Sequence, residues 1–531
     1  MSILAINGLS LRIGQTEILQ DVSLSMQHGE IVAITGESGS GKSMTALSVM
    51  GLLPRGAVAQ GQILLDGVDI LQTPESDLCQ MRGNAMGMVF QEPMTALNPV
   101  QTIGAQVAET ILIHEKTTKA EAHQRAAAML ERVGLKVAPT RYPHELSGGQ
   151  RQRVVIAMAI ALRPKLLIAD EPTTALDVTT QARILDLLQD LVREFDMGLL
   201  LITHDLAVVA DVADHIVVMQ KGRVVEAAPT AQLLANMQHP YTRALFEASG
   251  HAVQLPERGG VGQLLSVRNV VRDYPARRKA LLGPRPVVRA LDDVSFQMDH
   301  GERVGLVGES GCGKSTLTRA ILGLEEVQGG EIRLDGEPVF THHRPNLAVR
   351  RRMQVVFQDP YSSFNPRHRV DRLITEPFHL LDDPPQGKAR AAAIGKALGD
   401  VGLSSGDAGK YIHEFSGGQR QRIAIARALI IEPELIIFDE AVSALDVSVR
   451  AQVLDLIADL CRKRPLAYLF ISHDLSVVRT VTDRVMVMQA GKIVEQGETE
   501  QVFTNPQHPY TKTLIAAAPK LPELSHAVET V

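Results

Sequence analysis

Short apolar runs alternate along the chain with segments in which apolar and polar residues recur at a helical interval. The runs 31–35 and 303–307 each lead into a glycine-rich turn, and the helical pattern follows at 43–53 and 315–324. A continuous apolar run of this length is typical of a strand that is covered on both faces. Strands that alternate with helices predict an α/β fold with a mainly parallel sheet.

Further apolar runs end in polar residues that have chemical uses. Segments 165–170 and 434–439 end in aspartate, and segments 198–205 and 467–474 end in a histidine–aspartate pair. In a parallel sheet the carboxyl ends of the strands meet at one edge, and ligands bind there. The glycine-rich turns, the acids and the histidines are therefore expected to lie together.

The chain contains an internal repeat, because each of these features recurs in the same order in the second half. The interval predicts two copies of a domain of roughly 265 residues. We expect the first domain at residues 1–257 and the second at 258–531. The boundary lies within 256–263, where one proline, clustered glycines and no apolar periodicity predict a short linker.

A second irregular stretch, residues 275–286, interrupts the start of the second domain. It carries Arg277, Arg278, Lys279 and Arg285. A solvated basic loop is the simplest interpretation, and contact with anionic lipid headgroups is the alternative.

Composition argues against several classes of protein. The 531 residues are 45% hydrophobic and 21% charged, as in folded globular proteins, and the net charge is -6. A mildly acidic chain with no Trp, 7 Tyr and 12 Phe is poorly suited to binding nucleic acids. The 3 cysteines lie far apart and predict neither a disulfide framework nor a zinc site. The longest apolar run, 154–162, is too short to cross a membrane, and the first residues lack a secretory pattern.

Both glycine-rich turns match the pattern G-x-x-x-x-G-K-S between a strand and a helix. The backbone amides of such a loop wrap a polyphosphate, and the helix adds partial positive charge. Lys42 and Lys314 are expected to neutralise phosphate oxygens of ATP, and Ser43 and Ser315 to bind Mg²⁺. The expected ATP-binding residues are Gly36, Glu37, Ser38, Gly39, Ser40, Gly41, Lys42 and Ser43, and Gly308, Glu309, Ser310, Gly311, Cys312, Gly313, Lys314 and Ser315.

An aspartate–glutamate pair ends one strand in each half. Asp170 and Asp439 are placed to bind the Mg²⁺ water shell, and Glu171 and Glu440 are candidate bases for the attacking water. Adjacent strand residues point in opposite directions, so the two members of a pair would not share one role. Alone, such a pair is most often a polar cap on a strand, but its position beside a phosphate loop favours catalysis.

Two histidines and two glutamines complete the candidate catalytic set. His204 and His473 end the following strand and are candidates for a γ-phosphate contact. Gln91 and Gln358 stand in the matching segments MVFQEP and VVFQDP and are candidates for contacting Mg²⁺ and the attacking water. Each residue alone carries little signal, but the same context in both halves strengthens it.

A Ser-Gly-Gly-Gln motif precedes a helix in each half, at 147–150 and 416–419. Glycines and a serine at a helix start make a second anion site. Together with the phosphate loops, glutamines, Asp-Glu pairs and histidines, this motif makes nearly the whole chain resemble the ABC-type ATPase family. The resemblance implies two P-loop ABC nucleotide-binding domains in tandem, each with a mainly parallel core sheet and a helical subdomain.

In that family two domains meet head to tail and enclose ATP between the phosphate loop of one and the Ser-Gly-Gly-Gln motif of the other. The resemblance implies that Ser416 and Gly418 complete the first site, and that Ser147 and Gly149 complete the second. One chain would then form both sites.

The resemblance assigns two further features. The segments TALD and SALD resemble the loop that crosses between the halves, with Asp177 and Asp446. Members usually stack adenine on an aromatic residue near the first strand; Tyr274 fits that place, whereas its counterpart Ile13 offers no aromatic face. We therefore expect weaker nucleotide binding at the first site. Both sites keep the glutamate, so both are expected to hydrolyse ATP.

The subclass follows from weaker signals. Segments 91–99 and 358–366, and the HPYT tails that follow Gln238 and Gln507, resemble peptide-type importers, above all those of microcin C and related oligopeptides. Proline also starts ordinary helices, so HPYT alone does not decide. The resemblance implies a peripheral ATPase on the cytoplasmic side of the inner membrane, with two membrane-spanning permease subunits and an external or periplasmic substrate-binding protein as partners. No cysteine cluster follows HPYT, so no iron–sulfur cluster is expected.

Two other classes of ATPase fit the sequence less well. Tandem ATPases that act on the ribosome usually carry a long charged helical linker, whereas the linker here is short and the chain acidic. A DNA-repair ATPase would need zinc modules or long coiled coils, and the sequence has neither pattern.

Overall fold

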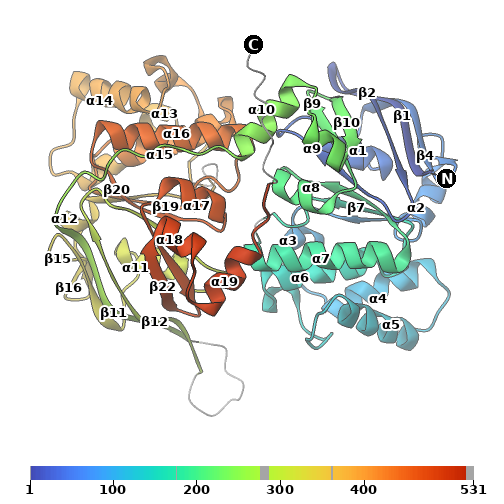
Figure 1. The fold of residues 1–531 in the computed structure, drawn as a ribbon, viewed down its shortest axis with the longest axis horizontal. Helices are drawn as coiled ribbons and strands as arrows, with labels where there is room; N and C mark the ends of the chain where they lie inside the picture. Colours follow the sequence, from blue (N-terminus) through green and yellow to red (C-terminus); the bar gives the residue numbers. More distant parts are fainter. Residues whose placement is uncertain (1, 175, 276–285, 360–362, 522–531) are drawn as a thin grey trace.

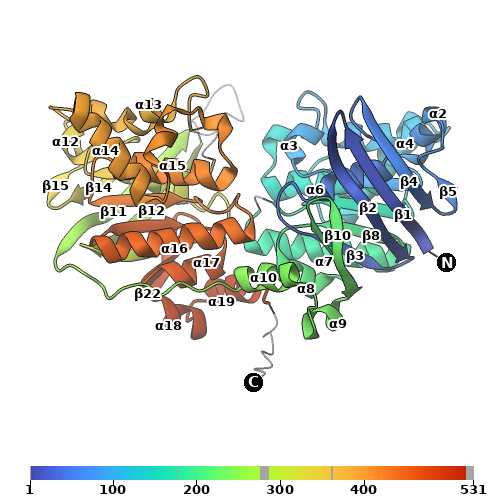
Figure 2. The same cartoon turned by 90° about the horizontal axis from the view of Figure 1, so that it is seen from above.

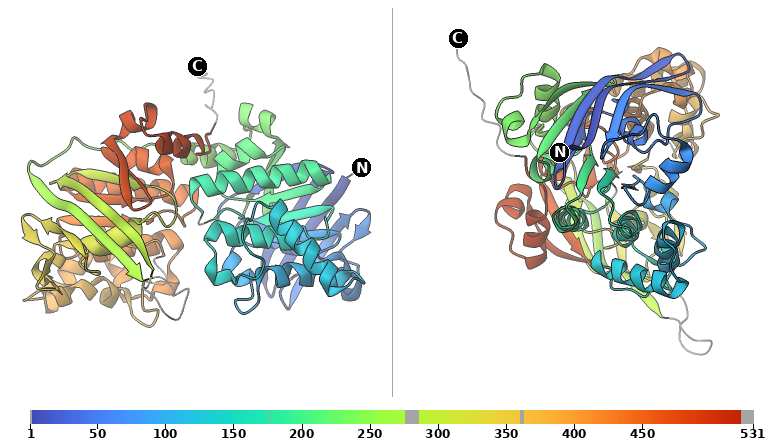
Figure 3. Two further views of the ribbon diagram at one scale, coloured as in Figure 1. Left: turned by 90° about the horizontal axis from the view of Figure 1, so that it is seen from below. Right: turned by 90° about the vertical axis from the view of Figure 1, so that its right-hand side faces the viewer.

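The computed structural model describes residues 2–174, 176–275, 286–359 and 363–521. Figure 1 shows two halves of similar architecture side by side, and Figure 3 shows the same two lobes from below. The two copies expected from the sequence are therefore two structural units. Most of the basic stretch 275–286 lies outside the described residues, so neither interpretation of it is tested.

Each half is built on a six-stranded sheet, in the order β10-β9-β3-β8-β7-β6 in the first half and the equivalent order in the second. All pairs are parallel except the edge pairs β9–β10 and β21–β22. The strands of the first half are β3 (Ile31–Thr35), β6 (Met86–Val89), β7 (Leu166–Asp170), β8 (Gly198–Ile202), β9 (His215–Gln220) and β10 (Arg223–Pro229). The strands of the second are β13 (Arg303–Val307), β18 (Met353–Val356), β19 (Leu435–Asp439), β20 (Ala467–Ile471), β21 (Arg484–Gln489) and β22 (Lys492–Glu498).

The apolar runs of the sequence coincide with the central strands. Every residue of β3, β7, β8, β13 and β20 is buried, because helices and a second sheet cover both faces. Continuous burial explains why these strands read as unbroken apolar runs. The prediction of a mainly parallel α/β sheet is confirmed.

A four-stranded antiparallel sheet lies beside each core sheet and was not predicted from the sequence. Its strands are β1 (Ser2–Ile13), β2 (Thr16–Gln27), β4 (Ala57–Leu65) and β5 (Val68–Asp69), and β11 (Gln263–Pro275), β12 (Val287–Asp299), β14 (Gly329–Leu334) and β15 (Glu337–Pro338). Register shifts interrupt the pairing of β1 with β2 and of β11 with β12. These shifts break the period of two by which a half-buried strand is recognised in a sequence.

Helices surround both sheets. Those of the first half are α1 (Lys42–Val49), α2 (Glu75–Met81), α3 (Pro93–Ala96), α4 (Ile103–His114), α5 (Lys119–Arg132), α6 (Gly148–Ala159), α7 (Val178–Phe195), α8 (Leu206–Val212), α9 (Thr230–Ala235) and α10 (Pro240–Ser249). Those of the second are α11 (Lys314–Ile321), α12 (Leu347–Arg350), α13 (Val370–Ile374), α14 (Gly387–Asp400), α15 (Gly417–Leu429), α16 (Val447–Lys463), α17 (Leu475–Val481), α18 (Thr499–Thr504) and α19 (Pro509–Ala516).

The helical subdomain is formed in the first half by α4, α5 and α6, which pack on one another. In the second half α13 and α14 each pack on α15. Among the described residues, no helix has the combination of length and apolar character that spanning a bilayer requires.

The last helix of each half packs on the other half. Helix α10 lies against α16, and α19 lies against α7 (Figures 1 and 2). The linker after α10 is irregular, as expected, but it is fixed to the second half. Arg462 and Arg303 donate hydrogen bonds of 2.8 Å each to the carbonyl oxygens of Gln254 and Pro256. The domain boundary at residues 257 and 258 stays a prediction.

Candidate functional site

The two glycine-rich loops connect β3 to α1 and β13 to α11 at the carboxyl edge of each core sheet. Gly36 and Gly308 begin the loops with φ angles of 147° and 153°. A Cβ atom at either position would lie 2.2 Å from a backbone carbonyl oxygen, that of Met219 or Met488. Only glycine fits there, because both the φ angle and the close backbone approach exclude a side chain.

The lysine of each loop is folded back onto the loop. Nζ of Lys42 donates hydrogen bonds of 2.8 and 2.9 Å to the carbonyl oxygens of Gly36 and Glu37. Lys314 makes the matching bonds, of 2.7 and 3.0 Å. Burial lowers the pKa of Lys42, although nearby carboxylates, Glu171 first among them, act in the opposite direction. A desolvated ammonium group of this kind attracts an anionic ligand strongly.

The remaining predicted loop residues lie in the same two turns. These are Gly39, Ser40 and Gly41 in the first loop, and Gly311, Cys312 and Gly313 in the second. The side chains of Ser40 and Cys312 are buried.

The candidate Mg²⁺ ligands lie beside the loops. Oγ of Ser43 donates a hydrogen bond of 3.2 Å to Oδ1 of Asp170. Burial raises the pKa of Asp170 and raises the pKa of Asp439 to about 6, which shows that nearby positive charge does not offset the desolvation of these carboxylates. Hydroxyl and carboxylate oxygens beside a phosphate loop are the donors that Mg²⁺ prefers, so the residues present fit this ion.

The candidate base of the first site is held by three side chains. Oε2 of Glu171 accepts hydrogen bonds from Nε2 of Gln91 at 2.8 Å and from Oγ1 of Thr174 at 2.9 Å. Nδ1 of His204 lies 3.3 Å from Oε1 of the same carboxylate. Burial alone would raise the pKa of Glu171, but the contacts with His204 and Thr174 and the charge of Lys42 together lower it. The carboxylate is therefore ionised at neutral pH and able to accept a proton.

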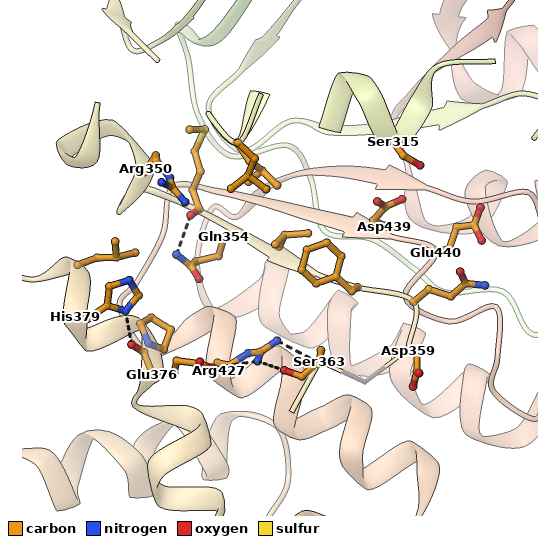
Figure 4. Close-up of a pocket in the computed structure, with 18 residues that line it drawn as sticks. Ser315, Arg350, Gln354, Asp359, Ser363, Glu376, His379, Arg427, Asp439 and Glu440 are labelled. Atoms are coloured by element: carbon orange, nitrogen blue, oxygen red, sulfur yellow. Dashed lines mark hydrogen bonds and ion pairs between the residues drawn. The ribbon is translucent and has the colours of Figure 1, made fainter. Parts of the chain in front are cut away.

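The second site opens into a cavity of 720 Å³ lined by Ser315, Gln358, Asp439 and Glu440. Figure 4 shows three of them, Ser315, Asp439 and Glu440, at one end of this cavity. Nδ1 of His473 lies 3.6 Å from Oε2 of Glu440, and this contact lowers the pKa of Glu440. The predicted catalytic residues of both halves are thus brought together at the carboxyl edge of each sheet.

Both candidate bases have a left-handed backbone, with φ angles of 48° at Glu171 and 53° at Glu440. Their amides donate hydrogen bonds of 2.8 and 2.9 Å to the carbonyl oxygens of Ile202 and Ile471, at the ends of the neighbouring strands. A non-glycine residue in this region of φ is uncommon and marks functional turns. The sharp turn gives the glutamate a different direction from the preceding aspartate, which agrees with separate roles for the two acids.

The serine motifs begin helices α6 and α15. Ser147 and Ser416 each cap their helix. Their hydroxyl oxygens accept hydrogen bonds from the amides of Gln150 and Gln419, at 3.3 and 3.4 Å. A Cβ atom on Gly149 would lie 2.3 Å from Cγ2 of Thr180. A Cβ atom on Gly418 would lie 2.3 Å from Cγ1 of Val449, on helix α16. Each motif is therefore packed against the long helix of its own half. Its contact with a nucleotide held by the other half stays a prediction.

The two halves are joined at the phosphate loops by reciprocal contacts. Oδ1 of Asp446 accepts the amide of Ser38 at 2.7 Å, and Oδ2 of Asp177 accepts the amide of Ser310 at 3.3 Å. These are the aspartates of the TALD and SALD segments. Each phosphate loop thus receives a carboxylate from the opposite half, as the crossing loops require.

The residues that follow these aspartates also cross between the halves. Val447 is buried in the hydrophobic core of the first half, and Val178 in that of the second. Oγ1 of Thr179 donates a hydrogen bond of 2.5 Å to Oε1 of Glu309. The apolar crossing contacts show that the halves are packed together and not merely tethered.

The predicted adenine platform is only partly open. The guanidinium of Arg272 lies 4.8 Å from the centre of the Tyr274 ring, and the Tyr274 hydroxyl bonds the carboxylate of Glu325. One face of the ring is therefore covered. Stacking of adenine on Tyr274, and its absence at Ile13, stay predictions.

Several contacts of the site were not predicted from the sequence. Thr174 and Thr179 were not singled out, and Tyr241 and Tyr510 were noted only as part of HPYT, although the hydroxyl groups of both tyrosines contact a phosphate loop. The signal available for the tyrosines was the recurrence of HPYT at the same place in both halves.

Comparison with known families gives two matches in each half. The profile described as ABC transporter matches residues 19–174 and 291–443. The profile described as oligopeptide/dipeptide transporter, C-terminal region, matches residues 225–255 and 494–530, which include the HPYT tails.

Individual proteins are similar over nearly the whole chain. The chain is 46% identical to the glutathione import ATP-binding protein GsiA of Escherichia coli, over 98% of this chain and 90% of that protein. The protein of the same name from Shigella sonnei shows the same identity and coverage. Among solved structures, CbiO1 from Clostridium perfringens, part of the ABC transporter complex CbiONQ, is 29% identical with a TM-score of 0.40. The match covers 44% of this chain and 91% of that one.

Proposed function

Because the chain belongs to the ABC transporter family, with the C-terminal region of its oligopeptide/dipeptide transporters in both halves, we propose that it energises an importer of peptides or peptide-like compounds. Its activity is ATP binding and hydrolysis coupled to transport. The relatives named for glutathione import extend the substrate class to glutathione-like peptides. The structural observation that carries the proposal is the reciprocal contact of each phosphate loop with an aspartate of the other half.

The residues of each site have separate roles in hydrolysis. The loop amides and Lys42 or Lys314 bind the phosphates, and Glu171 or Glu440 accepts a proton from the attacking water. Bound Mg²⁺ would neutralise phosphate oxygens, held by the serine after each lysine and by the aspartate before each glutamate. Both halves keep the full set, so we propose hydrolysis at both sites.

ATP binding would favour the state in which the halves are closed. A ligand shifts a conformational equilibrium only by its difference in affinity for the two states. A nucleotide touched by the phosphate loop of one half and by Ser416 and Gly418, or Ser147 and Gly149, of the other has such a difference. Closure and reopening of the two halves would then change the side of the membrane to which the transport path is open.

The membrane partners are proposed to be two permease subunits served by an external substrate-binding protein, with this chain peripheral on the inner face of the membrane. The cavity of the second half supports a docking position. It runs from the candidate site towards Arg350, Glu376 and His379 (Figure 4), and its wall includes two exposed apolar side chains, Leu324 and Phe357. Phe357 directly precedes Gln358, so an occupant of the groove can move a candidate catalytic side chain.

Isolation in mild detergent tests this function. The chain should co-purify with membrane-spanning permease subunits. Phe357→Asp should reduce the yield of these subunits several-fold without loss of ATP binding. Val261→Asp is the matched control, because Val261 is 98% exposed and lies in the linker, outside the residues that line the groove. Recovery of ribosomes in place of permeases would contradict the proposal.

A further inference from the structure

The HPYT tail of each half has a rigidly defined start. Nδ1 of His239 accepts the amide of Tyr241 at 3.2 Å, which caps helix α10. The carboxylate of Glu226 accepts the amides of Gln238 and His239 at 2.8 and 3.1 Å. The second half repeats all three contacts around α19. The backbone at the tyrosine and just before it is therefore held in place in both halves.

The tyrosine hydroxyl holds the phosphate loop of its own half. The hydroxyl oxygen of Tyr241 accepts the amide of Glu37 at 3.1 Å, and that of Tyr510 accepts the amide of Glu309 at 2.9 Å. The next amide of each loop is the one held by the aspartate of the other half. The first two amides after the leading glycine are thus both held by groups outside the loop.

The helix that carries each tyrosine is anchored on the other half. Just beyond α10, Nε2 of His251 lies 2.8 Å from Oδ1 of Asp455 on helix α16. Helix α19 packs against α7, and Leu521 beyond it packs into the core of the first half. Tyrosine, phosphate loop and opposite half therefore form one connected unit at each site.

We propose that Tyr241 and Tyr510 are positioning residues for nucleotide binding, each holding the phosphate loop of its own half from a helix that is anchored on the other half. The inference rests on the proposed ATP sites. Removal of the hydroxyl leaves a partly buried amide without its acceptor and frees the start of the loop. A loop that must be ordered by the ligand binds it more weakly, because part of the binding energy is lost to ordering.

Each loop can be tested separately in the full-length chain. Lys314→Ala disables the second loop, and ATP affinity of the first is then measured by equilibrium binding with and without Tyr241→Phe. We expect Tyr241→Phe to weaken binding about three- to tenfold, the range for one lost hydrogen bond. Tyr510→Phe is the matched comparison in this background, because its hydroxyl contacts the disabled loop. In the Lys42→Ala background, Tyr510→Phe should weaken ATP binding by the second loop, and Tyr241→Phe becomes the matched comparison.

Phenylalanine keeps the ring and its packing, so the nucleotide-free thermal midpoint should stay within about 2 °C of its parent. The stabilisation produced by added ATP should fall for Tyr241→Phe only. Equal loss of affinity with both phenylalanine variants, or with neither, would overturn the inference. A weaker affinity that merely follows a lower nucleotide-free midpoint would do the same, since the hydroxyl would then support the fold. If Lys314→Ala alone binds no ATP, the proposed sites themselves are wrong.

Discussion

Asp446 and Ser38 are 408 residues apart in the sequence, yet Oδ1 of Asp446 accepts the amide of Ser38 at 2.7 Å. The partner contact, between Asp177 and Ser310, is longer at 3.3 Å. A carboxylate that accepts a backbone amide makes a charge-assisted bond, which is stronger than a neutral one. Each half therefore contacts the phosphate loop of the other half, and the two contacts differ in length.

Removal of these carboxylates should weaken ATP turnover unequally. Asp446→Ala removes the shorter bond, and we expect a five- to tenfold loss of kcat/KM for ATP, about 1–1.5 kcal/mol. Asp177→Ala removes the longer bond, to Ser310 of the second phosphate loop, and should reduce kcat/KM by a smaller factor. Steady-state hydrolysis by the two single variants measures the difference. Asp446→Asn, which keeps an oxygen acceptor without the charge, should lie between Asp446→Ala and the unchanged chain. A larger loss for Asp177→Ala would contradict the ranking.

Substitution of both candidate bases should stop hydrolysis and retain nucleotide. Glu171→Gln with Glu440→Gln removes the proton acceptor at each site, and we expect turnover to fall about 10²- to 10⁴-fold. The doubly substituted chain should retain two ATP molecules after gel filtration. Lys42→Ala with Lys314→Ala is the control that loses hydrolysis together with binding. Normal turnover by the double glutamine variant would show that another group acts as the base.

Nucleotide affinity should differ between the two loops. Tyr274 offers an aromatic side chain at the second site and Ile13 does not at the first. We expect Ile13→Tyr to tighten ATP binding by the first loop about two- to tenfold, measured in the Lys314→Ala background. Tyr274→Leu should weaken ATP binding by the second loop to a similar extent, measured in the Lys42→Ala background. Equal ATP affinity of the two loops in the unchanged chain would contradict the prediction that the first site binds nucleotide more weakly.

The buried carboxylate of Asp439 should cost stability when no cation is bound. Burial raises its pKa from 3.8 to about 6, so between pH 4 and 6 the folded chain holds a proton that the unfolded chain has lost. Stability from this group is therefore lost as pH rises through that window. Asp439→Asn should raise the free energy of unfolding by on the order of 2 kcal/mol at pH 8 and by little at pH 4.

Denaturant unfolding in the presence of a chelator measures this effect. Asp382→Asn is the control, because the Asp382 side chain is 98% exposed. The variant at Asp439 should also lose the stabilisation that Mg²⁺ and ATP give the unchanged chain. A chain destabilised at pH 8 by Asp439→Asn would show that the carboxylate is already compensated.

The parts of the site that the sequence predicted are local in the chain. A strand, a glycine turn and a helix, or a strand that ends in acid, bring their residues together wherever the rest of the fold lies, so Lys42 and Asp170 could be assigned from pattern alone. The tyrosine contacts could not, because 204 residues separate Glu37 from Tyr241 and their meeting depends on how a helix packs. The antiparallel sheets were missed for a different reason, since bulges in β1 and β11 disturb the alternation of apolar residues.

The packing of α10 on α16 imposes an order on biosynthesis. His251 and Asp455 are 204 residues apart, so translation at about 5–20 residues per second separates their emergence by roughly 10 to 40 seconds. For that interval α10 can pack only on its own half, where it contacts α8 and β10. The contact of α10 with α16, and the bond between Ser38 and Asp446 at the first phosphate loop, therefore form only after the second half has been made.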